Sequence, residues 1–322
     1  MAVRSSSIFS SRHKRLLGLA CGMMLALVAS EAGARLLAPG FGHNGDWPSN
    51  ETFVKYTQLS NLSDPVDTVY VGSSLVAFGV DSKLISERTG NFHYNAALSA
   101  GQIETLDTWT REFVVPLARP RRIVLGVGPT ELAGTAADDG NRDRFAQAPA
   151  IAQARHPTRM RSAEESVQVR SELFNVRRQL RSVRDAGRAI VDGEFPQYWG
   201  PYGERQDDFG GERVVASLDA DSALDGPSPE RIATLNELVD WLTDQGIEVV
   251  LLEMPASPTL LDQLGGAGDD VLKVLEQTAS RQGVSVIDGR PLADQDELFF
   301  DGSHLNPAGQ AEFSQALSAK LE

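Results

Sequence analysis

The stretch that decides the fold is VDTVYVGSSLVAFGVDSKLISERTGNFHYNAAL, residues 66–98. It opens with a β-branched run over 66–72, continues into a helical stretch over 82–90 and returns to a strand-like run over 91–98. Gly90 ends the helical stretch, because glycine readily adopts the backbone conformation in which many helices terminate. A strand, a helix and a second strand in this order predict two parallel strands joined by a helical crossover.

The same alternation continues towards the C-terminus. Helical patterns and apolar strand-like runs follow one another: a helix over 103–118, a strand over 121–128, a helix over 230–246, a strand over 247–255, a helix over 269–283, a strand over 284–289 and a helix over 307–321. Five apolar strands joined by helical crossovers predict a parallel sheet covered by helices on both faces. We therefore expect one α/β domain over residues 66–322.

A polar segment at about 133–228 interrupts this pattern and is read as an insertion. It contains one expected helix over 163–190 and an aromatic, glycine-containing patch over 195–204. Either the insertion is a lid or substrate platform over the strand ends, or it is a surface helical hairpin whose aromatic side chains pack it down. Packing is favoured, because aromatic clusters are more often core than ligand shelves. The aromatic residues concerned are Phe195, Tyr198, Trp199 and Tyr202.

Composition limits the classes of function. The 322 residues are 41% hydrophobic and 23% charged, which is typical of a globular chain able to bury a substantial core. The formal net charge of -14 would repel a phosphate backbone, and the Arg-rich stretches are interleaved with acidic residues. Nucleic acid is therefore not expected as a partner.

The N-terminus is read as a basic flank over 1–15, an apolar segment over 16–37 and a linker over 38–65. The apolar segment fits an uncleaved membrane anchor or a signal peptide cleaved after small residues near Ala34, and the anchor is favoured. The basic flank predicts a cytoplasmic N-terminus and an extracytoplasmic remainder. Cys21, the single cysteine, lies in the apolar segment, so neither an internal disulfide nor cysteine-metal chemistry is expected in the rest of the chain.

In a parallel α/β sheet, ligands bind at the carboxyl ends of the strands. Four strand-end segments carry candidate functional residues, namely Ser73 and Ser74 after the first strand, Gly101 after the second, Gly128 and Thr130 after the third, and Asp301 and His304 before the last helix. A serine hydroxyl, an imidazole and a carboxylate on converging loops are the parts of an activated nucleophile. The hypothesis is that His304 removes the proton of Ser74 and that Asp301 orients the imidazole.

Each of these residues also has an ordinary structural explanation. Ser74 could cap a helix, Asp301 could be a turn residue and Gly101 a turn glycine. Glu131 could serve as an alternative acid, although capping of the third strand end is favoured. The histidines and carboxylates show no ligand spacing such as HExxH, so no metal site is expected.

The sequence resembles the SGNH or GDSL hydrolases over about residues 66–132 and 229–322. GSS at 72–74 is similar to the Gly-Asp-Ser block of that family, GPTE at 128–131 lies where Gly-x-Asn-Asp is expected, and DGSH at 301–304 matches Asp-x-x-His. Gly101 falls where the second block has its glycine.

This resemblance implies a flavodoxin-like three-layer α/β/α fold with a five-stranded sheet and no metal or organic cofactor. It implies Ser74 as nucleophile, His304 as general base and Asp301 as its partner, with the amides of Ser74 and Gly101 forming an oxyanion hole. Two departures are notable. Ser73 replaces the acid of the family, and Thr130 replaces the asparagine that would donate to the oxyanion.

A basic flank, an apolar segment and a strand ending in GSS resemble the membrane-anchored, extracytoplasmic branch found around bacterial exopolysaccharide acylation and deacetylation. The expected function is an extracytoplasmic serine esterase or O-acyltransferase acting on acyl, above all acetyl, esters of a carbohydrate. The alternative is a catalytically inactive module of the same fold that binds or scaffolds exopolysaccharide machinery.

Overall fold

The computed structural model describes residues 11–41, 49–132, 171, 173, 183–192, 199–205, 226–265, 267–280 and 283–321. The chain divides into two units, Met1–Asp46 with Arg159–Pro196 and Trp47–Thr158 with Gln197–Glu322. Most of the expected insertion at 133–228 lies outside the described residues. Part of it, Arg159–Pro196, belongs to the first unit rather than to the α/β unit.

The second unit is built on a five-stranded sheet in the order β2-β1-β3-β4-β5, and every neighbouring pair is parallel. The strands are β1 (Thr68–Val71), β2 (His93–Asn95), β3 (Arg122–Val127), β4 (Glu248–Glu253) and β5 (Val284–Asp288). The five strands predicted from the sequence are confirmed. The parallel α/β fold class is confirmed with them.

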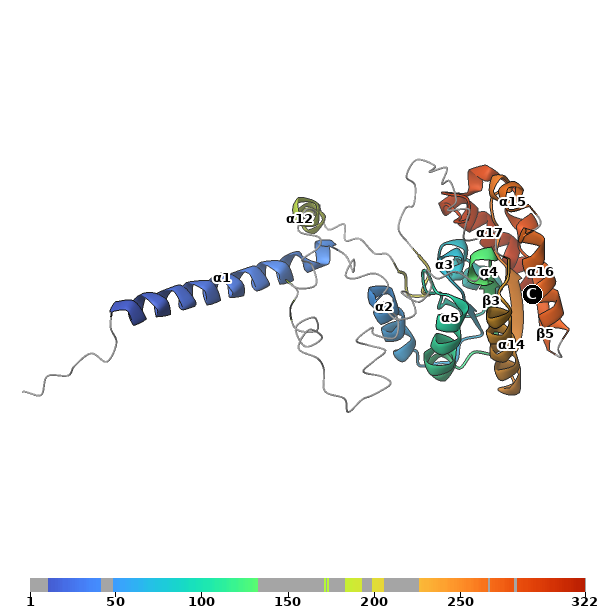
Figure 1. Cartoon of the computed structure of the whole chain (residues 1–322), viewed down its shortest axis with the longest axis horizontal. Coiled ribbons are helices and arrows are strands. Elements are labelled where there is room, and N and C mark those ends of the chain that lie inside the picture. Colours follow the sequence, from blue (N-terminus) through green and yellow to red (C-terminus); the bar gives the residue numbers. More distant parts are fainter. Residues whose placement is uncertain are drawn as a thin grey trace, which may run out of the picture. The chain divides into compact units, whose positions relative to one another are not determined.

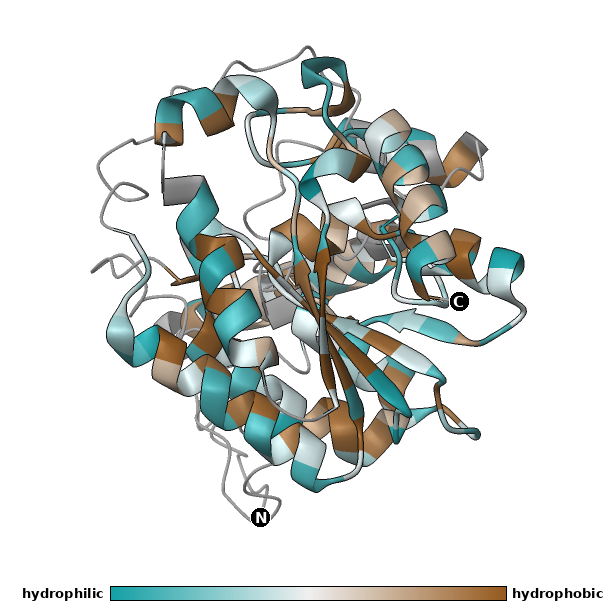
Figure 2. Ribbon diagram, turned by 90° about the vertical axis from the view of Figure 1, so that its right-hand side faces the viewer, coloured by the Kyte–Doolittle hydropathy of each residue, from teal (hydrophilic) through white to brown (hydrophobic). Residues whose placement is uncertain are grey.

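Successive residues of the central strands face two separate apolar layers, because side chains alternate across a sheet. On one face Ile123 and Leu251 join a buried cluster with the helices α5 (Ile103–Trp109), α14 (Pro229–Asp244) and α16 (Ala267–Ala279). On the other face Val124 and Leu252 join a cluster with α3 (Ser74–Gly79), α4 (Ser82–Thr89) and α17 (Pro307–Leu321). Figure 2 shows the apolar strands in brown between helices whose outer surfaces are largely hydrophilic. Burial on both faces explains why these strands read as continuous apolar runs.

Helices connect the strands of this unit and flank the sheet (Figure 1). They are α2 (Ser49–Ser60), α3 (Ser74–Gly79), α4 (Ser82–Thr89), α5 (Ile103–Trp109), the π-helical segment η1 (Thr110–Val114), α6 (Val115–Ala118), α7 (Pro129–Leu132), α14 (Pro229–Asp244), α15 (Pro258–Leu264), α16 (Ala267–Ala279), the 3₁₀ turns η4 (Arg290–Leu292) and η5 (Asp296–Leu298), and α17 (Pro307–Leu321). Gly90 has a φ of 72° and ends α4 as predicted.

Helix α2 lies in the segment that was expected to be a linker. Its side chains Glu51, Thr52, Lys55 and Leu59 are all buried. Leu59 belongs to the same apolar cluster as α5 and α14, so the segment is part of the α/β unit. The boundary expected at residue 66 therefore lies too late in the chain.

The first unit contains the helices α1 (Ser11–Phe41) and α12 (Val183–Asp192). Within α1, the segment Arg15–Leu37 is apolar and long enough to cross a membrane, by length and composition. Glu31 and Arg35, the charges near its C-terminal end, form an ion pair of 2.8 Å one helical turn apart. Glu31 also accepts hydrogen bonds from the Ser171 hydroxyl and the Leu173 amide in the same unit.

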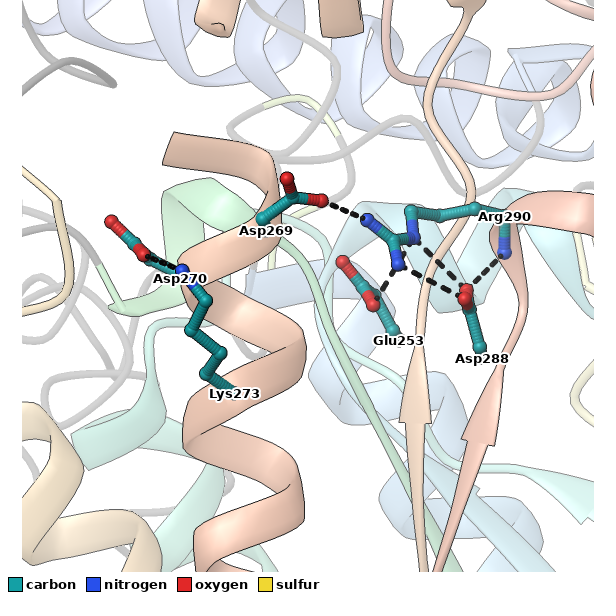
Figure 3. Close-up of polar contacts among 6 residues, drawn as sticks. All are labelled: Glu253, Asp269, Asp270, Lys273, Asp288 and Arg290. Carbon is teal, nitrogen blue, oxygen red and sulfur yellow. Dashed lines mark hydrogen bonds and ion pairs between the residues drawn. The ribbon is translucent and has the colours of Figure 1, made fainter. Parts of the chain in front are cut away.

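An ionic cluster joins the ends of β4 and β5 to the first turn of α16 (Figure 3). The Arg290 guanidinium pairs with Asp288 and Asp269, each at 3.0 Å, and lies 3.4 Å from Glu253. Glu253 is 2% exposed, and its Oε2 has no hydrogen-bond partner among the described residues. Burial raises the pKa of Glu253 to about 7, although Arg290 lowers it.

Candidate active site

Ser74 stands at the start of α3, directly after the end of β1. The residue before it, Ser73, is the helix N-cap, and its hydroxyl accepts a hydrogen bond of 3.1 Å from the Leu75 amide. The capping role that Ser74 could have had is therefore taken by Ser73. This leaves the Ser74 hydroxyl to interact outside its own helix.

Two glycines let α3 lie directly on the sheet. A Cβ atom added at Gly72 or at Gly126 would overlap the side chain of Val76 in α3. Gly72 ends the β1 segment and Gly126 lies in β3, so neighbouring strands make room for the same side chain. Close approach of the backbones sets the position of Ser74 above the strand ends.

His304 and Asp301 lie in the loop between η5 and α17. The loop is closed by an antiparallel bridge between Phe299 and Leu305 and by a hydrogen bond from the Phe300 amide to the His304 carbonyl. Within it, Asp301 Oδ1 accepts hydrogen bonds of 2.8 Å from the backbone amides of Ser303 and His304. The carboxylate thus has a fixed orientation before it meets the imidazole.

Asp301, His304 and Ser74 form a continuous chain of hydrogen bonds. His304 Nδ1 lies 2.9 Å from Asp301 Oδ2, and His304 Nε2 lies 2.7 Å from Ser74 Oγ. A carboxylate only accepts, so Nδ1 carries the proton in the neutral ring and Nε2 accepts from the serine hydroxyl. The three catalytic candidates named from the sequence are brought together.

The Asp301 carboxyl is ionised across the physiological range. Burial alone would raise its pKa, but the hydrogen bond and charge of His304, with the amides of Ser303 and His304, lower the pKa to about 2. A permanently charged acceptor favours the orientation in which the imidazole presents Nε2 to Ser74.

Phe78 lies beside the imidazole, and Arg205 packs on Phe78. Phe78 follows Ser74 by one helical turn, and its ring meets the His304 ring edge to face at a centroid distance of 5.2 Å. The Arg205 guanidinium lies 3.8 Å from the centroid of the Phe78 ring. An aromatic ring therefore borders the imidazole, with a cation packed on that ring, and neither residue had been singled out from the sequence.

The Gly101 amide does not match the role expected for it. It donates a hydrogen bond of 2.8 Å to the Leu98 carbonyl and so closes a four-residue turn. Glycine is needed there for space, since a Cβ would lie 2.7 Å from the Leu98 carbonyl oxygen and 2.8 Å from a Leu106 methyl carbon. The Ser99 amide of this turn donates to Glu51, whereas the Ala100 amide has no hydrogen-bond partner among the described residues.

The segment after β3 contains Gly128, Thr130 and Glu131. The Gly128 amide donates to Glu131 Oε2 at 2.8 Å, so Glu131 caps this strand end, as the sequence had favoured. Thr130 lies in α7, and its side chain is outside what the structure describes.

Of the four aromatic residues considered as a sugar platform, Phe195 and Tyr198 lie outside the described residues. Trp199 packs on the Lys55 ammonium, 4.4 Å from the ring centroid, and Tyr202 meets Phe92 at a centroid distance of 5.5 Å. These contacts are of the packing kind favoured from the sequence. Among the described residues, no group of three or more His, Cys, Asp or Glu side chains has an arrangement that could hold a metal ion.

No known protein family matches the sequence, and no curated protein matches it. Among solved structures, the chain is similar to a GDSL-like lipase from Bacteroides thetaiotaomicron, with 11% identity over 84% of this chain and 98% of that one and a TM-score of 0.42. It is also similar to an acetyl xylan esterase, with 14% identity over 80% of this chain and 100% of that one and a TM-score of 0.43. Similarities this weak carry no argument about the activity of this chain.

Proposed function

We propose that this chain is an ester hydrolase or acyltransferase of the SGNH type that uses Ser74 as its nucleophile. The observation that carries the proposal is the hydrogen-bond chain from Asp301 through His304 to Ser74, with distances of 2.9 and 2.7 Å. A serine hydroxyl is a weak nucleophile at neutral pH and needs an adjacent base of this kind.

In the first half of the reaction, Ser74 Oγ attacks the carbonyl carbon of an ester while His304 Nε2 takes the hydroxyl proton. The carbonyl oxygen becomes an oxyanion, and Asp301 stabilises the charged imidazolium. His304 then returns the proton to the leaving alcohol as the ester bond breaks. An acyl group is left on Ser74.

The oxyanion needs donors that are already in place. The Ser74 amide, at the first position of α3, is one candidate, and the Ala100 amide is the other, because the neighbouring amides of Ser99 and Gly101 already have partners. We assign the second donor to Ala100 rather than to Gly101. Thr130 stays a candidate for a third donor through its hydroxyl.

In the second half, His304 deprotonates the group that attacks the acyl-enzyme. Water as that group gives hydrolysis, and a sugar hydroxyl gives acyl transfer. The resemblance to the anchored SGNH branch supports acetyl esters of a carbohydrate as the substrate class. The apolar segment Arg15–Leu37 of α1 is preceded by Arg4, Arg12 and Lys14, which supports a membrane-tethered enzyme whose α/β unit is extracytoplasmic.

A fluorophosphonate probe tests the proposal, since it reacts with activated serines in folded proteins. We expect one covalent adduct on Ser74, located by peptide mass spectrometry, and none in the Ser74→Ala variant. Hydrolysis of short p-nitrophenyl esters and of acetylated sugars would then define the acyl group and the acceptor. A folded wild-type chain that does not react with the probe would refute the proposal of an enzyme. The alternative, an inactive module that binds or scaffolds polysaccharide machinery, would then be favoured.

A further inference from the structure

The turn Leu98–Gly101 has an unusual backbone. Ala100, its third residue, has a φ of 54°, a region in which the Cβ of an L-residue crowds the following carbonyl. Turns with a positive φ at this position normally have glycine there. Such a conformation persists in a protein only where neighbouring contacts hold it.

Glu51 of α2 supplies such contacts. Its carboxylate accepts a hydrogen bond of 2.9 Å from the Ser99 amide and one of 3.3 Å from the Ser99 hydroxyl. Glu51 is 3% exposed and Ser99 is equally buried. Both hydrogen bonds end on Ser99, so the first of the two central residues of the turn is held by a group outside it.

Lys55 lies one helical turn after Glu51 and binds the chain at Asn95, shortly before the Leu98–Gly101 turn. Its ammonium is fully buried and donates a hydrogen bond of 2.9 Å to the Asn95 carbonyl. The Asn95 side chain in turn donates to the carbonyls of Val76 and Val80 in and after α3. Helix α2 is thus connected to both the Ala100 turn and the helix that carries Ser74.

The two buried charges depend on each other. Burial raises the pKa of the Glu51 carboxyl, although Lys55 and the Ser99 hydrogen bonds lower it. Burial lowers the pKa of Lys55 to about 8, although Glu51 and Glu204 raise it, and Arg205 lowers it further. Removing one partner would leave the other as an uncompensated buried charge, whereas removing both would not.

We propose that Glu51 is a positioning residue for catalysis, whose carboxylate holds the Leu98–Gly101 turn so that the Ala100 amide stays in place as an oxyanion donor. This inference rests on the proposed function. Glu51 touches no reacting atom and acts through Ser99. Its loss therefore weakens stabilisation of the transition state rather than binding of the ester.

The test compares Glu51→Ala with Gln58→Ala in the full chain. Gln58 lies in the same helix and makes two hydrogen bonds, one to the Gly200 carbonyl and one with the Tyr94 hydroxyl, neither of them to the turn. For Glu51→Ala we expect kcat on p-nitrophenyl acetate to fall about 10²-fold with KM nearly unchanged, as for a misplaced catalytic group. Gln58→Ala should keep kcat within about twofold, because the hydrogen bonds that it removes do not reach the site.

Amide hydrogen exchange of the peptide covering 96–102 provides a second readout that does not depend on activity. We expect faster exchange there in Glu51→Ala and not in Gln58→Ala. If Glu51→Ala does not fold, Glu51→Gln and the doubly neutral Glu51→Gln, Lys55→Met variant replace it, and both should loosen the same peptide.

Unchanged exchange at 96–102 would overturn the role of Glu51, and so would a loosened turn with an unchanged kcat. Failure of the wild type to label at Ser74 would instead refute the proposed function. The exchange comparison would even then decide whether Glu51 holds the turn.

Discussion

His304 Nε2 lies 2.7 Å from Ser74 Oγ, although 230 positions separate the two residues in the chain. Ser74 follows β1 and His304 follows β5, and β3 and β4 lie between these strands in the sheet. The loop after β5 must therefore reach back across the strand ends. Helix α17, which begins directly after this loop, packs against α3 and α4 and holds it there.

If Ser74 and His304 share one proton transfer, their substitutions are not additive. We expect Ser74→Ala and His304→Ala each to lower kcat by roughly 10⁴-fold or more, and the double variant to be scarcely slower than either. Asp301→Asn should cost less, because the nucleophile and the base both remain and only the tautomer of the imidazole is no longer fixed. Steady-state kinetics on one acetyl ester measures all four variants, and independent, multiplying losses would show that the two residues act separately.

Thr130 stands where the resembling family has an oxyanion-donating asparagine. If that donor is missing here, Thr130→Asn should raise kcat roughly tenfold or more with little change in KM, because an oxyanion donor acts on the transition state. Thr130→Val should then be as fast as the wild type. A slow Val variant with no gain from Asn would mean that the threonine hydroxyl already donates.

His93 is a structural residue that should make stability depend on pH. It is buried between Tyr70 and Thr89, with ring nitrogens 2.9 and 3.0 Å from their hydroxyls, and burial lowers its pKa from 6.5 to about 4. As the pH falls, His93 therefore takes up its proton in the unfolded chain before it does so in the folded chain. The stability that neutral His93 contributes to the fold is complete above about pH 6.5 and is lost as the pH falls towards 4. The loss is on the order of 3 kcal/mol.

The measurement is urea unfolding of the wild type and His93→Gln between pH 7.5 and 4.5. The difference between the two proteins should shrink as pH falls. Comparison with the variant is essential because Glu253, whose raised pKa of about 7 has the opposite effect over an overlapping range, partly masks His93 in the wild type. A difference that stays constant with pH would contradict the prediction.

The Arg290 cluster offers a comparison of buried and exposed ion pairs (Figure 3). Arg290→Met removes the cation shared by three carboxylates, one of them the buried Glu253, and should destabilise the chain by about 3 kcal/mol at pH 7.5. Lys273→Met breaks the exposed pair with Asp270, which is 2.9 Å long, and should change stability very little. Chemical unfolding of both variants checks this, and equal effects would contradict it.

The basic residues before the apolar segment Arg15–Leu37 predict a cytoplasmic N-terminus and an extracytoplasmic α/β unit. A C-terminal tag on the full chain should therefore be digested when protease is added to intact spheroplasts. A tag that survives until the cells are lysed would refute this topology. Release of a soluble form trimmed near Ala34 would instead indicate a cleaved signal peptide.

The sequence predicted the sheet because the inner strands β1, β3 and β4 are buried on both faces and so read as apolar runs. It also predicted which loops carry Ser74, Asp301 and His304, since strand ends can be located from the pattern. The structure brings these three side chains together, and their catalytic roles stay a prediction until the variants are measured.

Two features of the site could not be predicted from the sequence. Gly101 looked like the backbone donor because a glycine is visible in a sequence, whereas the φ of Ala100 and the partner of each amide are properties of the folded turn. Helix α2 was predicted to be a linker because its buried face includes two charged residues, Glu51 and Lys55, where an apolar face would be expected. Their spacing of four residues was the available signal.

Gly72 and Gly126 have a consequence for how this chain can change. Because both make room for Val76 beneath α3, even an alanine at either position would lift the helix and move the serine away from its imidazole. The proposed ester-cleaving step would therefore depend on two positions that touch neither substrate nor proton. Saturation mutagenesis screened for turnover should find both positions as intolerant as the triad itself, and compensating changes, where they arise, should shorten the side chain at 76.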